Sequence, residues 1–263
     1  MKHLSYAILE SHVAEIVLNN PPQNRVDEQM GRELLDAVDA IEASDARAVI
    51  LRAEGKDFSF GGDIMTWPET PPRELRAKFE SFIFAFNRFE QMPLPVIAAV
   101  NGLCYGGGFE LAVRADVIFA GETARFGHPE ATIGIVTVLG GIYRVAERVG
   151  RARAYEWALT SEQVPAQTMA SAGLVNHVVP DAELMDTTTA FAQKIASGPT
   201  RSHSAHKALL RLWENSGPKV ADDAMWDIAM PLFASKDSRM ALPAAVEAIK
   251  AGNPRPAMPF TGQ

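Results

Sequence analysis

Two glycine-rich turns and two glutamates are the parts of this 263-residue sequence best suited to chemistry. The longer turn, residues 101–110 (Asn-Gly-Leu-Cys-Tyr-Gly-Gly-Gly-Phe-Glu), has three consecutive glycines and ends at Glu110. Because glycine has no Cβ, a ligand can approach the main chain closely there. If a helix begins at these glycines, the free N–H groups of its first turn and its dipole favour an oxyanion. We therefore expect an oxyanion site with Glu110 in that first turn, although a structural turn in which Glu110 caps its own helix explains the glycines equally well.

A second turn, residues 58–64 (Phe-Ser-Phe-Gly-Gly-Asp-Ile), also follows a buried apolar run. Its backbone could present another N–H group to the same ligand. Two converging donors are what an enolate or a tetrahedral oxyanion requires. Within this turn, Asp63 is expected mainly to satisfy local backbone N–H groups.

Glu130 stands twenty positions after Glu110, in residues 126–130 (Phe-Gly-His-Pro-Glu). A helix, a strand and a return between the two glutamates bring their carboxylates back toward one place, as a candidate acid/base pair. His128 is a further candidate base, but packing or hydrogen bonding within a loop accounts for it better.

Alternating strands and helices must position these turns. The sequence predicts a hairpin over residues 6–18 and helix N-capping by Asp27, followed by apolar residues at helical spacing. A second amphipathic helix begins at Pro71-Pro72 and ends before Met92-Pro93, and we interpret its aromatic stripe as core. This alternation indicates a largely parallel, buried sheet, whereas helices dominate after about residue 140. Apolar strands are expected at 48–51, 95–100, 116–120 and 175–179.

Composition excludes several classes of protein. A formal net charge of -7 and the scattered cations argue against binding to nucleic acid. The single cysteine, Cys104, excludes an intrachain disulfide and a multi-cysteine zinc cluster, and we interpret it as a small buried apolar residue. The first residues lack the apolar core of a secretory signal, and no apolar run approaches the roughly 20 residues that span a bilayer. We therefore expect a cytoplasmic protein with no membrane partner.

Taken together, these segments resemble the crotonase, or enoyl-CoA hydratase/isomerase, superfamily. The family's Ala-Gly-x-Asp turn, its Asn-Gly-x-x-x-Gly-Gly-Gly-x-Glu segment and its Phe-Gly-x-Pro-Glu segment are matched in order and spacing by residues 60–63, 101–110 and 126–130. Smaller similarities lie at residues 24–26, at Gly140-Gly141 with Arg144, at residues 172–175 and at residues 259–262.

The resemblance implies an α/β fold: a ClpP/crotonase-type spiral of ββα units over residues 1–199, with a helical C-terminal trimerisation region over residues 200–263. The chain would assemble as a homotrimer or a dimer of trimers.

The resemblance also implies the site. The backbone N–H groups of Gly62 and Gly107 would form the oxyanion hole for a thioester carbonyl. Glu110 would take part in activating a water for attack on the β-carbon, and Glu130 would deliver a proton to the α-carbon. No metal or other cofactor is implied, because coenzyme A enters as the thioester part of the substrate. The coenzyme A portion would lie against Asn24, Arg25, Val26, Phe60, Gly61, Asp63 and Ile64.

The sequence departs from the family pattern at three places. Phe60 replaces a small residue, and Thr137-Val138-Leu139 replaces Pro-Gly-Ala at the acyl pocket. The lysine common after the first turn and the basic residue common at the C-terminal end are missing, which leaves Arg25 and Lys56 as candidates for the phosphates.

Both glutamates together favour hydration of a 2-enoyl-CoA, with an unusual branched, cyclic or aromatic acyl group. The alternatives are double-bond isomerisation, C–C cleavage or decarboxylation of an acyl-CoA, and a non-catalytic acyl-CoA binding protein.

Overall fold

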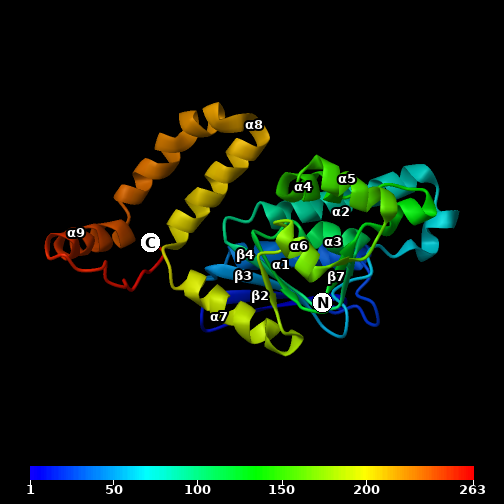
Figure 1. Ribbon diagram of the computed structural model, residues 1–263, viewed down its shortest axis with the longest axis horizontal. Coiled ribbons are helices and arrows are strands. Elements are labelled where there is room, and N and C mark those ends of the chain that lie inside the picture. The colour runs from blue at the N-terminus through cyan, green and yellow to red at the C-terminus, as the bar shows by residue number, and fades with distance from the viewer.

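A six-stranded sheet runs through the body of the molecule, and the computed structural model describes all 263 residues around it. Its spatial order is β1-β2-β3-β4-β6-β9, in which β1 and β2 form an antiparallel hairpin and all later neighbours are parallel. Figure 1 shows this sheet with helices packed around it. The strands are β1 (Leu4–Ile8), β2 (Val13–Leu18), β3 (Ala48–Ala53), β4 (Val96–Val100), β6 (Val117–Gly121) and β9 (His177–Val179).

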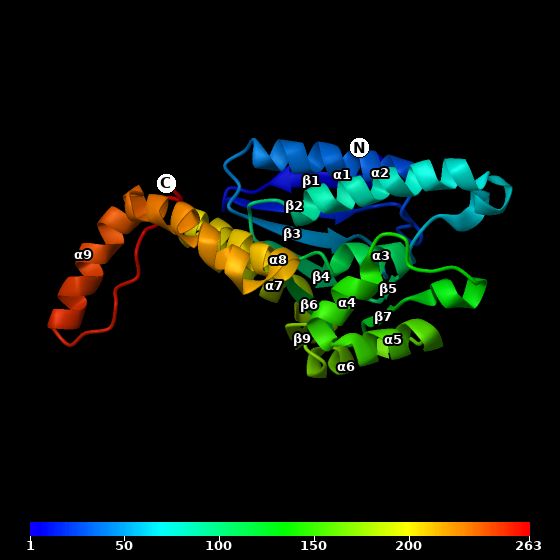
Figure 2. The ribbon, with the colours of Figure 1, turned by 90° about the horizontal axis from the view of Figure 1, so that it is seen from above.

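Both faces of the sheet are covered, which explains why the central strands are continuous apolar runs. Helices α1 (Glu28–Glu42) and α2 (Pro72–Glu90) lie side by side over one face (Figure 2), and α7 (Leu184–Ala196) packs on the other. Successive residues of β3 therefore enter different cores: Val49 faces the large cluster, whereas Ile50 faces the smaller one beneath α7. Further helices of the body are α4 (Gly141–Val149), α5 (Arg151–Thr160), α6 (Ala166–Ser171) and the 3-10 turn η3 (Asp181–Glu183).

A second, three-stranded sheet brings the two candidate turns together. It consists of β5 (Leu103–Tyr105), β7 (Arg125–Gly127) and β8 (Val164–Pro165). Each long strand β4 and β6 continues into a short strand of this sheet and then into a helical turn, α3 (Gly106–Ala112) after β5 and η2 (Pro129–Ile133) after β7. Because β5 and β7 pair in parallel, with Tyr105 opposite Gly127, the segments that carry the two glutamates leave the sheet at the same edge.

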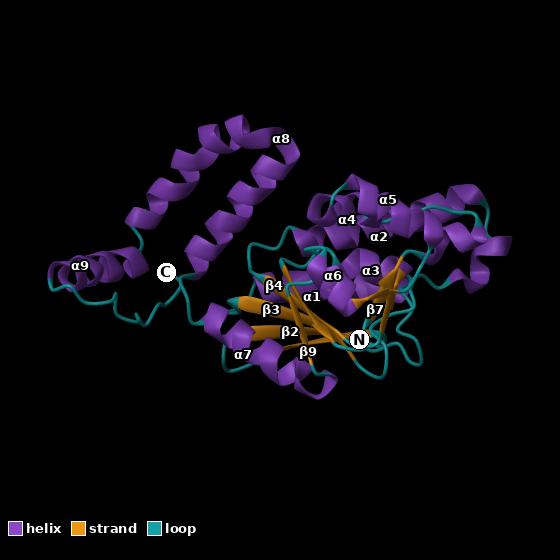
Figure 3. Cartoon of the chain, in the orientation of Figure 1, coloured by secondary structure: helices purple, strands orange, loops and turns teal.

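The C-terminal region forms an arm that extends away from the sheet (Figure 1). Helix α8 (Thr200–Phe233) is kinked at Gly217, which has a φ of 79°, and α9 (Lys236–Lys250) follows. Beyond α7 the chain is helix and loop only (Figure 3). The last residues fold back, so that Asp237 accepts backbone hydrogen bonds from Thr261 and Gly262. None of the helices combines the length and apolar character needed to cross a lipid bilayer.

Most expected elements are confirmed. Asp27 caps α1 by accepting a 2.8 Å hydrogen bond from Met30 N, and Cys104 is fully buried. The expected strand over residues 175–179 was too long, because residues 175–176 lie outside β9. The short strands β5, β7 and β8 were missed, since elements of two or three residues carry no periodicity.

Candidate active site

The two glycine turns place two backbone N–H groups side by side. A Cβ atom built on Gly107 would lie 3.5 Å from the Gly62 nitrogen. The first turn is fixed by hydrogen bonds from Val26 N to Gly61 O (2.8 Å) and from Asp63 N to Val26 O (2.9 Å), and Gly62 N–H has no acceptor within the protein. Gly107 stands in the first turn of α3, where N–H groups lack intrahelical partners. The pair can therefore stabilise one oxyanion.

Close packing between the turns requires glycine at two positions. Gly61 has a φ of +91°, in the left-handed region that residues with a Cβ rarely adopt. Gly108 lies directly against the other turn, since an added Cβ would stand 2.3 Å from Ser59 Cβ. The glycines therefore bring the two backbones close enough to share a ligand.

Glu110 is buried, with 1% of its surface exposed, and its carboxylate is held from outside its own helix. Its Oε1 accepts hydrogen bonds from Leu139 N (2.8 Å) and Gly141 N (2.9 Å). The expectation that Glu110 falls in the first turn is wrong, because α3 begins at Gly106 and places it one turn later; it does not cap α3. Burial raises the pKa of Glu110, while these two N–H groups and two nearby arginines oppose that rise.

Glu130 has a different environment. It lies in η2, and its Oε2 is buried without a hydrogen-bond partner. Burial, opposed by a hydrogen bond from its own backbone and assisted by the charge of Glu110, raises the pKa of Glu130 to about 7. The two carboxyl groups therefore lie in environments that separate their roles: Glu110 is supported as a carboxylate, whereas Glu130 is favoured as a protonated acid.

His128 is a buried neutral side chain rather than a base. Its ring packs on Phe109, with 4.8 Å between ring centroids, and neither ring nitrogen has a hydrogen-bond partner. Burial lowers the pKa of His128 to about 4. Packing therefore holds His128 in position, and hydrogen bonding does not. Its Nδ1 lies 3.8 Å from Glu130 Oε2, which is too far for a hydrogen bond.

One cavity of about 210 Å³ contains both N–H groups and both glutamates. Eleven of the twenty residues around it are hydrophobic, so the cavity suits an apolar chain next to a polar reacting centre. Among the residues expected from the sequence, those that line it are Arg25, Val26, Phe60, Gly61, Gly62, Ile64, Gly107, Glu110, Glu130, Val138 and Leu139.

Three of the expected site residues do not line the cavity. Asn24 is buried behind it, where its side chain accepts from Asn20 N and donates to Glu54 O and Asp57 O. Asp63 caps η1 (Ile64–Glu69) through Met65 N, which agrees with the local role expected for it. Thr137 lies beside lining residues, with its hydroxyl buried and unpartnered.

Sequence reasoning missed the aromatic wall of the cavity. Trp67 packs against Gly62 and makes an edge contact with Phe79, and Phe79 and Phe82 of α2 also line the cavity. Phe82 belongs to the large core cluster and Phe79 packs against it, as expected for the stripe, but both rings also face the cavity, which the sequence did not predict. Helical spacing shows that the stripe faces inward, but it does not show which of its rings reach the cavity. The other residues missed there are Gly106, Pro129, Thr132, Ile133, Ile135 and Val136.

The spiral fold, with two free N–H groups facing two buried glutamates, defines a protein of the crotonase class. The family model described as enoyl-CoA hydratase/isomerase matches residues 9–252, and the chain belongs to that family.

Individual relatives agree with this assignment. The chain is 32% identical over 245 residues to the mitochondrial enoyl-CoA hydratase of Pongo abelii, covering 91% of this chain and 82% of that one. It is 37% identical over 191 residues to the short-chain-enoyl-CoA hydratase of Clostridium acetobutylicum, covering 72% and 73%. The crystal structure of an enoyl-CoA hydratase from Bacillus anthracis superimposes with a TM-score of 0.89 at 28% identity, covering 100% of both chains.

Proposed function

We propose that the protein hydrates the 2,3 double bond of a 2-enoyl-CoA. The observation that carries the proposal is the pair of buried glutamates in contrasting environments, both lining the cavity that holds the N–H groups of Gly62 and Gly107. A family protein with a single carboxylate at this site could move a proton but would lack a separate acid and base for adding water.

The geometry supports addition of water in two steps, through a thioester enolate. The Glu110 carboxylate accepts a proton from water as its oxygen bonds to the β-carbon, and the electrons move onto the thioester oxygen. The N–H groups of Gly62 and Gly107 stabilise this enolate, and each such donor contributes roughly 2.7 to 4 kcal/mol in comparable sites. The enolate then collapses as the α-carbon takes the proton of Glu130. Exchange with solvent returns the Glu110 proton and reprotonates Glu130.

The acyl group we propose is branched, cyclic or aromatic. The rings of Trp67, Phe79 and Phe82 and the apolar side chains of Val138 and Leu139 support this proposal, because they surround the cavity with apolar surface. Coenzyme A would enter as part of the thioester, without a separate cofactor. Arg25, at the cavity and hydrogen-bonded to Gln23, would contribute to holding its phosphates.

The assembly we propose is a homotrimer or a dimer of trimers. Its support is the set of exposed apolar residues on the C-terminal arm, where Trp213, Trp226 and Phe233 are 53%, 67% and 58% exposed. Such surface is costly to leave in water and suits contact with further copies of the chain. Sedimentation should give three or six times the mass of one chain; a monomer would contradict this part of the proposal.

A panel of acyl-CoA thioesters, followed by absorbance and mass, tests the reaction with the wild-type protein and with Glu110→Gln and Glu130→Gln. A hydratase adds the mass of water and loses most of its turnover in either variant. An isomerase would leave the mass unchanged and depend chiefly on one glutamate. Binding without turnover would indicate a non-catalytic acyl-CoA binding protein, and no binding at all would reject the proposal.

A further inference from the structure

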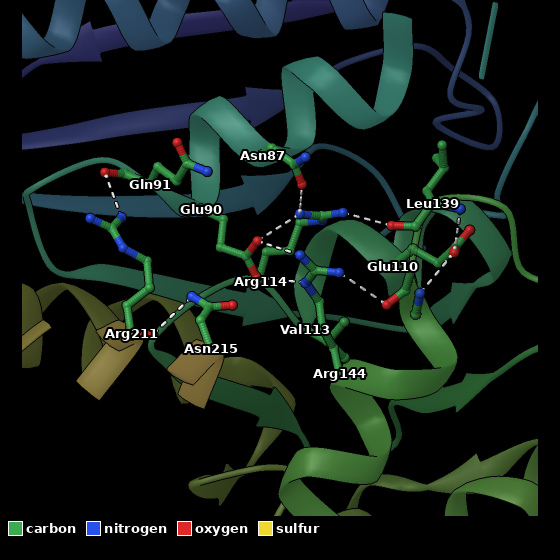
Figure 4. Close-up of polar contacts among 12 residues, drawn as sticks. Asn87, Glu90, Gln91, Glu110, Val113, Arg114, Leu139, Arg144, Arg211 and Asn215 are labelled. Carbon is green, nitrogen blue, oxygen red and sulfur yellow. Dashed lines mark hydrogen bonds and ion pairs between the residues drawn. The ribbon is translucent and has the colours of Figure 1, made fainter. Parts of the chain in front are cut away.

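Two arginines and one glutamate form a partly buried ion cluster behind Glu110 (Figure 4). Arg114, whose side chain is fully buried, donates from Nη1 to Glu90 Oε2 (2.8 Å) and to Asn87 Oδ1 (2.8 Å). Arg144 of α4 holds the same carboxylate with two bonds, from Nε to Glu90 Oε1 (2.6 Å) and from Nη2 to Glu90 Oε2 (2.5 Å). Glu90, near the end of α2, therefore fixes both guanidinium groups in one place.

The free ends of both guanidinium groups point to the segment that holds Glu110. Arg114 Nη2 donates to Leu139 O (2.6 Å), and Arg144 Nη1 donates to Gly140 O (3.2 Å). The opposite edge of this segment donates to Glu110, from Leu139 N and Gly141 N. Figure 4 shows Leu139 between Arg114 and Glu110. The segment is thus bound by cations through its carbonyl groups and by a carboxylate through its N–H groups.

One peptide group connects Arg144 directly to Glu110. The carbonyl of Gly140 and the N–H of Gly141 belong to the same planar amide. A cation at the oxygen of an amide polarises it and makes its N–H a stronger donor. Arg144 therefore strengthens the hydrogen bond that supports the Glu110 carboxylate, while Arg114 fixes the neighbouring amide.

We propose that Arg114 and Arg144, joined by Glu90, are positioning residues that keep Glu110 ionised and aimed at the cavity through residues 139–141. The inference deepens the proposed function, since it concerns the group that would activate water. Glu90, which does not line the cavity, pairs with both arginines. Without its negative charge, the guanidinium groups of Arg114 and Arg144 would repel each other.

The charges around Glu110 come from several elements. Glu110 faces the cationic Arg114 beyond its own helix and Arg144 of α4, and across the cavity it faces Glu130 of η2. His128, neutral through burial, also lies beside it, because a Cβ added to Gly141 would meet both His128 Cε1 and Glu110 Cγ at 2.6 Å. Among these neighbouring groups, only Arg114 and Arg144 carry a positive charge that lowers the pKa of Glu110.

The decisive experiment compares kcat/KM against pH for the wild type, Arg144→Met and Arg144→Lys. Loss of the cation should protonate Glu110 at higher pH and move the acidic limb of the profile upward by roughly one unit, about tenfold in rate on that limb. Turnover should fall while KM changes little, and Arg144→Lys should lie between because it keeps the charge. Arg114→Met should shift the limb in the same direction.

Arg148→Met is the matched control, because Arg148, like Arg144, is a partly buried arginine of α4. It donates to Val113 O, Ala115 O and Leu174 O and does not touch residues 139–141. Its replacement should lower stability without moving the acidic limb. If the Arg144 variants give the same profile as Arg148→Met, or the wild-type profile, the inference is wrong.

A stability measurement separates this inference from the proposed function. Glu110→Gln is combined with Arg144→Met, and urea unfolding is followed from pH 5 to 8. Above pH 7, removing the carboxylate should stabilise the Arg144→Met protein more than it stabilises the wild type. Equal effects in both backgrounds would overturn the inference even if hydration is found, whereas inactivity of the wild type towards every thioester would reject only the proposed function.

Discussion

Replacing Glu130 by Gln separates the stability cost of this carboxyl group from its chemical role. Burial raises its pKa from 4.5 to about 7, so the folded protein retains a proton that the unfolded chain releases between these values. Because the folded state then binds more protons, the free energy of unfolding falls as the pH rises from 4.5 through 7. The difference of about 2.5 units (7 minus 4.5), at about 1.4 kcal/mol per unit, corresponds to roughly 3 kcal/mol at pH 8.

Glutamine has the same shape and no charge. Glu130→Gln should therefore match the wild type in unfolding free energy at pH 4 and exceed it by roughly 3 kcal/mol at pH 8. Urea titrations at pH 4, 6 and 8 measure this difference, and Glu10→Gln, at an exposed position, controls for the loss of a carboxylate. A difference that is constant with pH, or a variant less stable than the wild type at pH 8, would refute the assignment of Glu130 as a buried acid.

Three further perturbations test the site. Burial lowers the pKa of His128 from 6.5 to about 4, so the free energy of unfolding falls as the pH falls from 6.5 through 4. His128→Leu should remove this loss, which amounts to roughly 3 kcal/mol at pH 4 in urea titrations. Gly108→Ala should force α3 away from Ser59 and reduce turnover by about a hundredfold, measured with the best thioester of the panel. Trp67→Ala should open the cavity beside Gly62 and move selectivity towards bulkier acyl groups by at least about tenfold, measured as a ratio of kcat/KM values.

The sequence suggested that Glu110 and Glu130 return toward one place, and the resemblance to the crotonase family made this prediction specific. Apolar runs identified the parallel strands, and the glycines marked the turns that follow them. The strands β5 and β7, whose parallel pairing brings the segments of Glu110 and Glu130 to the same edge, were not among the predicted elements. The alternation of strands and helices therefore predicted the class of fold, whereas the meeting of the two segments depends on the second sheet.

Other features depended on tertiary contacts that no local pattern reports. Phe79 lines the cavity and Phe86 is buried core, although both belong to one helical stripe. The partners of Glu110 come from residues 139–141, and Arg114 reaches them from beyond the end of α3. Nothing in the sequence distinguishes Arg114 from the other cationic residues. The packing of α2, α3 and α4 brings it next to Glu90 and Arg144.

The contrast between the two glutamates is itself an argument for their roles. The Glu110 carboxylate accepts two N–H bonds and lies near two cations, which oppose the rise that burial causes in its pKa and hold the group in a fixed position. Glu130 Oε2 and both ring nitrogens of His128 are buried without partners, an arrangement that costs free energy and is uncommon in folded proteins. A protonated carboxyl group tolerates such surroundings far better than a carboxylate does. The reverse assignment, with Glu130 as the ionised base, would place a charge on a carboxylate whose Oε2 has no donor and a proton on Glu110, which receives two N–H bonds.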